Sequence, residues 1–585
     1  MSYDLMLKNA LCLHEEGQLD QAEKIYRQIL EAVPDNPDIL NLLGLIAQAK
    51  ELHREACALF MNALRIKHDD IPIMYNLAFS LKADNQHAEA MKYFLKIREL
   101  RPEIKETYNE IALLYWQKND IAEARKNWQY AISSDKNFVE AKVNLAMSFK
   151  KENMAKAIED MKKLTIEFAN SSMVFYGLAC LYFENKDFNK SWNCAIKAKE
   201  LAPTDDNVRV LLGKLACIDK QFENAKIYFA KAELINPFNI EAIRGLADIY
   251  SKESNFEEAE VRYKKLLQAD AKNFEVHNNY AEMLQRQGRK AEALEEYRAA
   301  VIINHKSAEV CNNLALILRD VGEFDEALGL LFNALNYSPN ADEISINISE
   351  TLMILAETDK EKAFKIAENW FNSHKTNIFA QHLYATFKGE DFEDNKIYAK
   401  KLFDHFADNY ELVMQNLGYS VPLAMGRIAG SLEGRILDLG CGTGLVGQAL
   451  KNDRNKIIGV DISQKMIDRA ATKKVYDKLI KADIIEFIQN NNDFDWVVCA
   501  DVLGYIGDLS LIVKSLKNNN LLFSVETSEK CEKYKISESG RYKHNPEYID
   551  NLLYENGFRN IIKEKTILRC ENNIPVEGMI FVCHH

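Results

Sequence analysis

Small residues recur along the first 340 residues with a period of 34 positions. One series consists of Ala22, Ala56, Ala90, Ala124, Ala157, Ser191, Ala225, Ala259, Ala293 and Ala327, with a single step of 33 before Ala157. In most repeats a second series stands twelve positions earlier, at Ala10, Gly44, Ala78, Ala112, Ala146, Ala179, Gly213, Ala247, Ala281 and Ala315. A period of this length predicts a tandem array of two-helix units, in which small residues let neighbouring helices approach closely.

Bulky residues follow many members of the first series by four positions, one helical turn further along, where they would fill the space that the small residues leave. They are Tyr26, Phe60, Phe94, Trp128, Phe229, Tyr263 and Tyr297. The cysteines of this part of the chain fit the same packing role as small apolar side chains. These features resemble the tetratricopeptide repeat. The resemblance predicts an all-α solenoid of about ten repeats over residues 1–340.

Two departures from the period are informative. An eleventh unit at about 342–375 is degenerate, because its small residue Ala363 is out of register. Together with a further helix predicted at 378–388, it should form a cap and linker over residues 341–395. The single step of 33 predicts a shorter turn between two helices near Glu152.

Asparagines recur at one position on the first helix of several repeats. They are Asn76, Asn144, Asn279, Asn313 and Asn347, with Asn41, Asn109, Asn278 and Asn312 one residue earlier. In the family that the repeats resemble, this face is usually concave and binds proteins or peptides. A row of amides there would bond the backbone of an extended peptide. The alternative is that asparagine is common at this position without a local purpose.

The hydrophobic pattern changes near Arg435, where short apolar runs begin to alternate with helical segments. The runs cover 435–439, 456–460, 478–482, 494–500, 520–526, 561–569 and 577–583. This alternation predicts a doubly wound α/β domain within residues 396–585. In such sheets ligands bind at the carboxyl ends of the strands.

The first predicted strand runs into a turn whose glycines remove Cβ atoms where a ligand must approach the backbone. These glycines are Gly440, Gly442 and Gly444. Gly442-Thr-Gly444-Leu-Val-Gly447, followed by Asp461, also fits a dinucleotide fingerprint. Asp438 stands two residues before the first glycine, where its charge would repel a pyrophosphate and attract a cation. S-adenosyl-L-methionine, a sulfonium with an α-amino group, satisfies that charge.

The stretch Asp438-x-Gly440-x-Gly442-x-Gly444 resembles motif I of class I S-adenosylmethionine-dependent methyltransferases, and residues 459–466, 481–483 and 494–506 agree with later motifs in order. The resemblance implies a Rossmann-like fold with S-adenosyl-L-methionine as cofactor. It assigns cofactor binding to Asp438, Gly440, Cys441, Gly442, Gly444, Asp461, Ile462, Met466, Asp483, Ala500 and Asp501.

The resemblance and the ligand's chemistry together suggest individual roles. Asp461 is placed to accept hydrogen bonds from both ribose hydroxyls. Ile462 and Met466 would flank the adenine, and Asp483 would accept its exocyclic amine or serve only as a turn residue. Ala500 and Asp501 would face the methionine end of the cofactor.

A sulfonium is already a good electrophile, so the protein mainly has to align donor and acceptor and exclude water. A general base is optional, and the candidates for a catalytic role are Asp501, Tyr505 and His544, with Glu526 and Tyr542 also on the expected rim. Asp501 and His544 have the more suitable basicity. For His544 the preferred interpretation is nevertheless a surface residue just before a helix.

A leader segment precedes the α/β domain and carries several aromatic residues. They are Phe403, Phe406, Tyr410 and Tyr419. In the family that the domain resembles, a helical leader folds over the cofactor. We expect Tyr410 and Tyr419 to line that lid, whereas Phe403 and Phe406 would either line it or pack the leader on the sheet.

Composition narrows the possible partners. Residues 401–585 carry 23 Lys and Arg and 25 Asp and Glu, a net charge of −2, so the first 400 residues carry the remaining −11 of the total −13. Neither part offers a basic platform, and no nucleic-acid partner is expected. We find no apolar run of membrane-spanning length and no cleavable leader. The eleven cysteines form no Cys-x-x-Cys pair, so we expect no metal and a reducing cytoplasm.

The sequence therefore predicts a cytoplasmic S-adenosylmethionine-dependent methyltransferase of the bacterial type, fused behind a tetratricopeptide array. Its acceptor would be a protein, a carrier-bound group or a small molecule, and the length of the array favours a protein-borne acceptor. One alternative is a protein-binding scaffold with a catalytically silent methyltransferase-like domain, which the intact glycine motif and Asp461 argue against. Another is a nicotinamide-dependent oxidoreductase, which Asp438 argues against.

Overall fold

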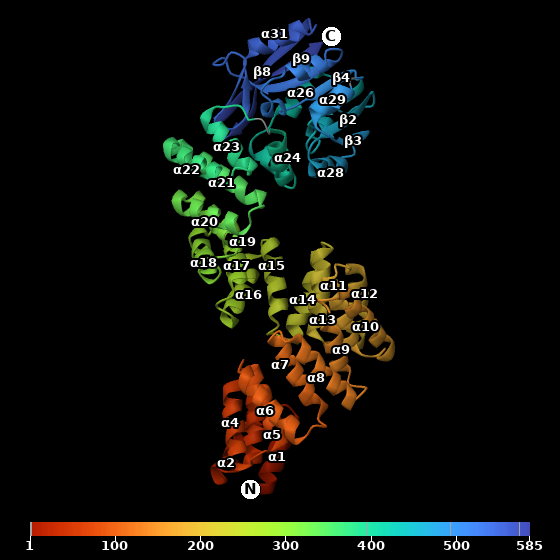
Figure 1. The fold of residues 1–585 in the computed structure, drawn as a ribbon, viewed down its shortest axis with the longest axis vertical. Coiled ribbons are helices and arrows are strands. Elements are labelled where there is room, and N and C mark those ends of the chain that lie inside the picture. The colour runs from red at the N-terminus through yellow and green to blue at the C-terminus, as the bar shows by residue number, and fades with distance from the viewer. Residues whose placement is uncertain (1–2, 393–394, 492, 572–573) are drawn as a thin grey trace. The chain divides into compact units, whose positions relative to one another are not determined.

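The structure is a computed structural model that describes residues 3–392, 395–491, 493–571 and 574–585 (Figure 1). The chain forms two compact units, Met1–Leu266 and Leu267–His585. The second unit contains the last repeats together with the α/β domain, so its boundary differs from the one expected at residue 340. The division at residues 340 and 395 stays a prediction.

Ten helix pairs follow one another in the described part of the array, as the period predicts. Each pair is one repeat, and together they form an all-α array. Their bounds are α1 (Tyr3–Glu15), α2 (Leu19–Ala32), α3 (Pro37–Ala49), α4 (His53–Ile66), α5 (Ile71–Ala83), α6 (His87–Leu100), α7 (Lys105–Gln117), α8 (Ile121–Ser134), α9 (Val139–Met147), α10 (Met154–Glu167), α11 (Ser172–Glu184), α12 (Phe188–Leu201), α13 (Asp206–Ile218), α14 (Phe222–Ile235), α15 (Ile240–Lys252), α16 (Phe256–Ala269), α17 (Phe274–Arg286), α18 (Lys290–Ile303), α19 (Ala308–Asp320) and α20 (Phe324–Tyr337).

The small residues of the first series are buried completely, which confirms their predicted packing role. The second series meets the bulky residues: a Cβ built on Gly213 would lie 2.7 Å from the ring of Phe229, and one on Gly44 would overlap the ring of Phe60. Because interiors are close-packed, an added methyl group at these points would force the helices apart.

The turn inside most repeats contains one residue in the left-handed conformation. These residues are Gly17, Glu51, Asn85, Asn119, Lys186, Lys220, Ser254, Gly288 and Gly322, with φ between 58° and 85°. The next residue donates its N–H to a carbonyl five positions back, as Gln86 does to Leu81 at 2.8 Å, which is a Schellman-type helix end. In the fifth repeat α9 ends early at Met147, and Asn153 has φ −152° instead. The missing residue thus removes the left-handed turn position.

The recurrent asparagines bond to one another between neighbouring repeats. In four such pairs the side-chain Nδ2 of the later residue donates to the Oδ1 of the earlier one: Asn76 to Asn41 at 3.1 Å, Asn144 to Asn109 at 3.2 Å, Asn313 to Asn278 at 3.0 Å, and Asn347 to Asn312 at 2.8 Å. Asn109, Asn278 and Asn312 are buried. The position therefore has a local purpose, because these amides join one repeat to the next.

Three helices follow the ten pairs and three more lead into the sheet. They are α21 (Asp342–Thr358), α22 (Lys360–Ser373), α23 (Ile378–Lys388), α24 (Asn395–Phe406), α25 (Tyr410–Asn416) and α26 (Val421–Ala429). Helix α21 has 17 residues, where the first helix of most repeats has 13, in keeping with a degenerate unit. Helix α23 has the predicted bounds, and left-handed Gly389 ends it.

The C-terminal part forms a seven-stranded sheet of order β3-β2-β1-β4-β5-β9-β8. Strands β1 to β5 pair in parallel, and β9 is antiparallel to both β5 and β8. All seven predicted strands are present: β1 (Gly434–Leu439), β2 (Asn455–Asp461), β3 (Lys478–Lys481), β4 (Trp496–Cys499), β5 (Asn520–Glu526), β8 (Asn560–Glu571) and β9 (Ile574–His584). The α/β Rossmann-like fold is confirmed. The sequence did not indicate the small hairpin of β6 (Tyr534–Ile536) and β7 (Tyr542–His544).

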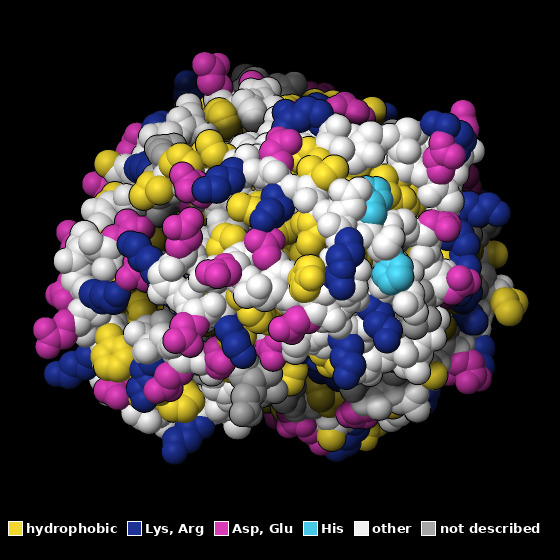
Figure 2. Space-filling view, turned by 90° about the horizontal axis from the view of Figure 1, so that it is seen from above, with side chains coloured by type: hydrophobic (Ala, Val, Ile, Leu, Met, Phe, Trp, Pro, Cys, Tyr) yellow, Lys and Arg dark blue, Asp and Glu magenta, His cyan; other side chains and the backbone are white. Residues whose placement is uncertain are grey.

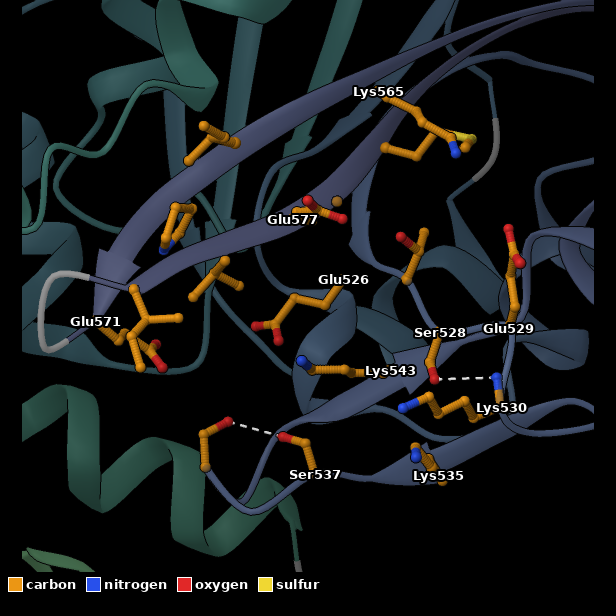
Figure 3. A pocket seen from close by; sticks show the side chains of 18 of the residues that line it. Glu526, Ser528, Glu529, Lys530, Lys535, Ser537, Lys543, Lys565, Glu571 and Glu577 are labelled. Atoms are coloured by element: carbon orange, nitrogen blue, oxygen red, sulfur yellow. Dashed lines mark hydrogen bonds between the residues drawn. The ribbon is translucent and has the colours of Figure 1, made fainter. Parts of the chain in front are cut away.

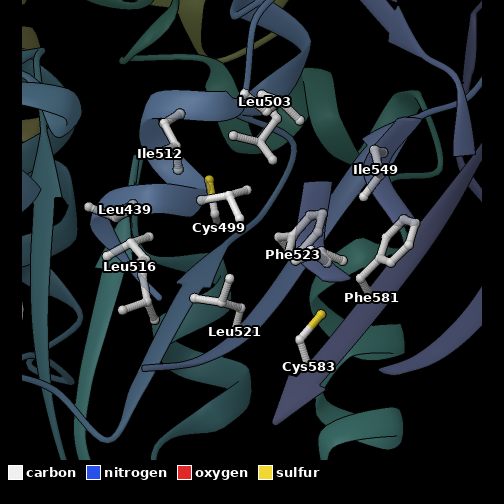
Figure 4. Packing of buried hydrophobic residues seen from close by; sticks show 14 of the residues in the cluster. Leu439, Cys499, Leu503, Ile512, Leu516, Leu521, Phe523, Ile549, Phe581 and Cys583 are labelled. Carbon is white, nitrogen blue, oxygen red and sulfur yellow. The ribbon is translucent and has the colours of Figure 1, made fainter. Parts of the chain in front are cut away.

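Helices cover both faces of this sheet, because both sets of alternating strand residues are apolar. They are α27 (Leu445–Leu450), α28 (Gln464–Thr472), α29 (Ile484–Asn490), α30 (Ser510–Ser515) and α31 (Pro546–Glu555), with a short 3₁₀ helix η1 (Leu503–Tyr505). Leu439, Phe523 and Phe581 pack under α30 and α31 (Figure 4), and the two rings stack at 4.9 Å. Ile436 and Leu522 face the other side, against α26 and α27.

The described surface carries charges of both signs. On the face shown in Figure 2, Lys and Arg side chains are interspersed with Asp and Glu. No helix among the described residues is both long and apolar enough to cross a bilayer.

Candidate active site

A cavity of about 540 Å³, called the inner cavity below, opens at the carboxyl ends of β1 to β4. Eight of the predicted cofactor-binding residues line it: Gly440, Gly442, Asp461, Ile462, Met466, Asp483, Ala500 and Asp501. The other lining residues are Asp391, Phe392, Asn395, Lys396, Ala399, Phe403, Tyr410, Ile484, Ile485, Glu486, Gln489, Val502, Tyr505, Ile506, Gly507, Asp508, Tyr534 and Tyr542. Its position is the one that ligands occupy in open α/β sheets.

Asp461 at the end of β2 is held by the backbone around it. Its Oδ2 accepts the N–H of Gly442 at 2.9 Å, and its Oδ1 accepts the N–H of Ser463 at 2.8 Å. Burial raises the pKa of Asp461, and these two N–H groups oppose the rise. Each carboxylate oxygen keeps further acceptor capacity toward the cavity. The side chain is thus fixed in one orientation as an acceptor of two more hydrogen bonds.

The glycines after β1 have different tasks. Gly442 has φ +53°, and a Cβ built on it would meet no atom within 4 Å, so the space above it is open to a ligand. Gly444 and Gly447 instead make room for the ring of Tyr476, which a Cβ at Gly447 would overlap. Of the three, only Gly442 lines the inner cavity. The motif therefore provides ligand access at Gly442 and helix packing at the later two glycines.

Asp438 is buried beneath the turn and does not line the inner cavity. The hydroxyl of Tyr476 donates to its Oδ2 at 2.7 Å. Burial raises the pKa of Asp438 to about 7, with the nearby charge of Asp461 adding to the rise. The expectation that Asp438 meets the cofactor directly therefore finds no support in this arrangement, and Cys441 is likewise buried away from the cavity.

Ile462 and Met466 form one wall of the inner cavity, beside Asp483. Ser463 caps helix α28 by accepting the N–H of Met466 at 3.2 Å, which fixes that wall. Asp483 caps α29 by accepting the N–H of Glu486 at 3.0 Å, and the ammonium of Lys396 lies 3.8 Å from its carboxylate. Asp483 is therefore a helix cap and also faces the cavity.

Aromatic side chains close the other side of the cavity. Phe403 of α24 and Tyr410 of α25 line it, and the ring of Phe403 meets that of Tyr505 edge-on at 5.3 Å. Phe406 and Tyr419 do not line it, and Tyr419 packs on the core beside α26. The leader thus covers the cavity with two of the four aromatics expected there.

Asp501 belongs to a buried cluster of ion pairs. Its Oδ1 accepts from Nη2 of Arg541 at 2.5 Å and from Nη1 of Arg569 at 3.2 Å. Both arginines also pair with Glu526, at 2.7 and 2.6 Å. Burial raises the pKa of Asp501, and the two guanidinium groups oppose that rise. A carboxylate held by two arginines is a better anchor than a free proton acceptor.

Asp501 also has an unusual backbone. Its φ is +57°, in the left-handed region that aspartate tolerates better than most residues. The hydroxyl of Ser524 on β5 accepts its N–H at 2.8 Å. The ion pairs and this bond together hold the loop after β4 in place beside the cavity.

The expectation that His544 is a surface residue is wrong. His544 is fully buried in β7, and its Nε2 donates to the carbonyl oxygens of Ile506 at 3.1 Å and Gly507 at 3.0 Å. It does not line the inner cavity, and burial lowers its pKa. Through these hydrogen bonds His544 holds the loop that contains Ile506 and Gly507, two residues that do line the cavity.

A second cavity of about 1370 Å³, the outer cleft, is lined by residues of the β6–β7 hairpin and of strands β8 and β9 (Figure 3). Glu526 and Glu571 line it, together with Lys535, Lys543 and Lys565. Nε of Arg569 donates to Glu571 at 2.7 Å. The arginines of the buried cluster therefore reach both the inner cavity, through Asp501, and the outer cleft, through the two glutamates.

Several residues around the site were missed by sequence reasoning. Tyr476, Arg541 and Arg569 are the main ones. The sequence indicates Arg569 only weakly, because it is a charged residue inside the apolar run that forms β8. Nothing in the sequence around Arg541 indicates a role for it, because the hydrophobic pattern there does not predict a strand.

Known proteins resemble this chain in two parts. Residues 436–518 match a family model described as a methyltransferase domain, and residues 10–70, 244–309 and 310–343 match models described as tetratricopeptide repeats. The chain joins tetratricopeptide repeats to a methyltransferase domain. The predicted fusion is thereby confirmed.

Two curated relatives match over part of their length. Putative methyltransferase YqeM of Bacillus subtilis is 28% identical over 141 residues, which cover 22% of this chain and 57% of the relative. Malonyl-[acyl-carrier protein] O-methyltransferase of Bacillus anthracis is 28% identical over 129 residues, covering 21% and 48%. The chain therefore spans about half the length of these relatives. A solved tetratricopeptide repeat protein from Parabacteroides merdae, 21% identical, covers 42% of this chain and 97% of its own, with a TM-score of 0.38.

Proposed function

We propose that this methyltransferase domain uses S-adenosyl-L-methionine and transfers its methyl group to an acceptor that reaches the inner cavity. The charge of the cavity supports this cofactor. Its lining contains one lysine, Lys396, and six acidic residues. Five of them, Asp391, Asp461, Asp483, Glu486 and Asp508, have no arginine partner among the described residues, and the sixth is Asp501, which is paired with two arginines. A pyrophosphate would be repelled by this lining, whereas a sulfonium with an α-amino group is attracted.

The donor set also fits the cofactor's shape. In this proposal Asp461 accepts the ribose hydroxyls, Ile462 and Met466 enclose the adenine, and Asp483 accepts its amine. The backbone at Gly440 and Gly442 and the loop at Ala500 and Asp501 hold the methionine end. The main support for this proposal is the oriented carboxylate of Asp461 beside the open space above Gly442.

When bound, the cofactor supplies an activated methyl group on a positive sulfur. The protein's own contribution is alignment and exclusion of water, for which Phe403, Tyr410 and Tyr505 are placed. Of the three catalytic candidates, Asp501 and Tyr505 line the cavity, and His544 does not. The carboxylate of Asp501 is already paired with two arginines, so we assign Asp501 a positioning role and do not assign it the role of general base.

We further propose that the acceptor is carried by a protein. One relative is named for a group on an acyl carrier protein, and tetratricopeptide repeats suggest protein partners for this chain. Binding a carrier on the array would raise the acceptor's effective concentration at the inner cavity. A carboxylate oxygen is the proposed methyl acceptor, because that relative is named as an O-methyltransferase of a malonyl group, which has a free carboxylate.

The test uses the full chain and labelled S-adenosylmethionine. Cofactor binding is measured by calorimetry, and methyl transfer is measured into cell extract separated into protein and small-molecule fractions. We expect micromolar cofactor binding, on the order of −8 kcal/mol, and base-labile label in the protein fraction, as expected of an ester. Label in small molecules alone would refute the carrier, and binding without any transfer would indicate a catalytically silent domain.

A further inference from the structure

Helix α23 at the end of the repeat array contacts the methyltransferase domain at one buried histidine. His382 donates from Nε2 to the carbonyl oxygen of Gly540 at 3.1 Å. Burial lowers the pKa of His382 to about 4, so the ring is neutral near pH 7 and keeps this N–H. Gly540 has φ +75°, and a Cβ built on it would lie 2.5 Å from Cε1 of His382. The ring of His382 thus lies against the backbone of Gly540 without room for a side chain on that residue.

The next residue along the chain, Arg541, reaches the inner cavity's wall. Its Nη1 donates to the hydroxyl of Tyr505 at 3.1 Å, and its guanidinium lies 4.7 Å above that ring. Its Nη2 donates to both the carboxylate and the carbonyl oxygen of Asp501. Arg541 does not itself line the cavity, but Asp501 and Tyr505 do. It therefore acts on the cavity through these two residues.

A second connection runs from His382 through helix α24. The ring of Tyr398 stacks on His382, with centroids 3.7 Å apart and planes at 8°. Five residues later on the same helix, Phe403 meets Tyr505 at the cavity. Both routes begin at one side chain of the cap and end at the loop after β4, so the cap and the cavity wall are mechanically joined.

We propose that Arg541 is a positioning residue for methyl transfer and that helix α23 of the repeat cap holds it in place through the contact between His382 and Gly540. The inference rests on the proposed function, because Asp501 and Tyr505 matter for transfer only if the inner cavity binds the cofactor. If it is correct, a helix that precedes the methyltransferase domain helps to position residues of its inner cavity.

The test compares Gly540→Ala with Gly322→Ala in the full chain. Both glycines are left-handed, at φ +75° and +85°, but a Cβ on Gly322, in the turn between α19 and α20, meets no atom within 4 Å. The backbone strain is matched, and only Gly540→Ala also pushes on His382. Amide hydrogen exchange is followed in residues 500–507 and in strands β1 and β5, and S-adenosylmethionine binding is measured by calorimetry.

We expect Gly540→Ala to speed exchange in residues 500–507, and to weaken cofactor binding, each on the order of tenfold, with β1 and β5 unchanged. Gly322→Ala should leave exchange in residues 500–507 as in the wild type. Arg541→Gln should reproduce the effect, and Arg541→Lys should restore part of it, since the charge is retained.

Exchange that rises equally in β1, β5 and residues 500–507 would show a structural role only and overturn the proposal. Should Gly540→Ala fail to fold, His382→Phe provides the same test, because it keeps the stack on Tyr398 and removes the donor. Wild-type exchange at 500–507 in a folded His382→Phe chain would then refute the role of α23. Absence of cofactor binding by the wild type would instead count against the proposed function, while the exchange result still judges the coupling.

Discussion

The side chain of Asp461 is oriented before any ligand arrives, because two backbone N–H groups hold its two oxygens. We expect Asp461→Ala to weaken S-adenosylmethionine binding on the order of 100-fold, since hydrogen bonds to a charged acceptor are worth about 1.5–3 kcal/mol each. Calorimetry on the full chain measures this. Asp468→Ala, an exposed change on the neighbouring helix α28, is the control and should bind as the wild type does. Equal affinities for all three chains would remove Asp461 from the site.

Asp438 should make the sheet's stability depend on pH. Its pKa of about 7 in the folded chain lies above the ordinary value near 4. Between about pH 4 and pH 7 the folded state therefore binds a proton that the unfolded state has released. Stability from this group is complete below about pH 4 and is lost as the pH rises to about 7.

Asp438→Asn should remove that dependence. Opening free energies of β1 amides, measured by hydrogen exchange at pH 5 and pH 8 without cofactor, should fall in the wild type by about 3 kcal/mol more than in the variant. Tyr476→Phe removes the hydrogen bond that lowers the pKa of Asp438. In this variant the opening free energy should therefore decrease more between pH 5 and pH 8 than it does in the wild type. A parallel pH profile in wild type and Asp438→Asn would show that Asp438 is ionised throughout.

How far the site could be predicted depends on the sequence distance between partners. Gly442, Asp461 and Met466 could be predicted to lie at one cavity because a local motif places them at or just after strand ends, and short-range rules describe such turns. Arg541 meets Asp501 across 40 residues, a pairing that no local pattern encodes. Asp438 was assigned to the ligand because its motif is local, whereas the Tyr476 that covers it comes 38 residues later.

In the turn after β1, Gly442 faces the cavity and Gly447 packs against Tyr476. Alanine substitutions at these two glycines should therefore have different effects. Gly442→Ala places a methyl group in the open space of the cavity, so we expect cofactor affinity to fall at least about tenfold with a stability loss of about 1 kcal/mol. Gly447→Ala lies in helix α27 and would displace Tyr476, so we expect a stability loss of about 1–3 kcal/mol. Thermal unfolding and calorimetry on both variants provide the comparison. The interpretation fails if Gly447→Ala melts as the wild type while Gly442→Ala unfolds.

At the scale of elements, the long runs were predictable and the short hairpin was not. Strand β5 has the predicted bounds because its residues are apolar on both faces, as a central strand of a doubly wound sheet must be. Strands β6 and β7 have three residues each, too few for a period to show. This is why His544 was expected at the surface: the hairpin that buries it could not be read from the pattern.

The asparagine pairs change what the repeat array offers to a partner. Amides that bond between neighbouring repeats stiffen the array, so they are less available to a peptide than a free row would be. A partner on this face would contact the array mainly through other side chains. Recognition should then depend on the partner's own sequence or fold more than on its backbone.

For the whole molecule, the proposal of a carrier-borne acceptor predicts what removal of the first unit will do. A chain that begins at residue 273, in the turn before α17, lacks helices α1 to α16 and keeps the cap, the leader and the sheet. We expect it to bind S-adenosylmethionine as the full chain does, because the inner cavity lies entirely in the second unit. Its kcat/KM for the protein-borne acceptor should fall at least about tenfold, mainly through KM, because the tethered partner is lost.

A free small-molecule mimic of the methylated group is the control, since its KM depends on the inner cavity alone. The full and shortened chains should therefore methylate it equally. If the shortened chain instead methylates the native protein fraction as efficiently as the full chain, the first unit does not recruit the acceptor. An equal loss on both acceptors would mean that the first unit supports the fold of the second, because a recruitment surface cannot affect a substrate that it does not bind.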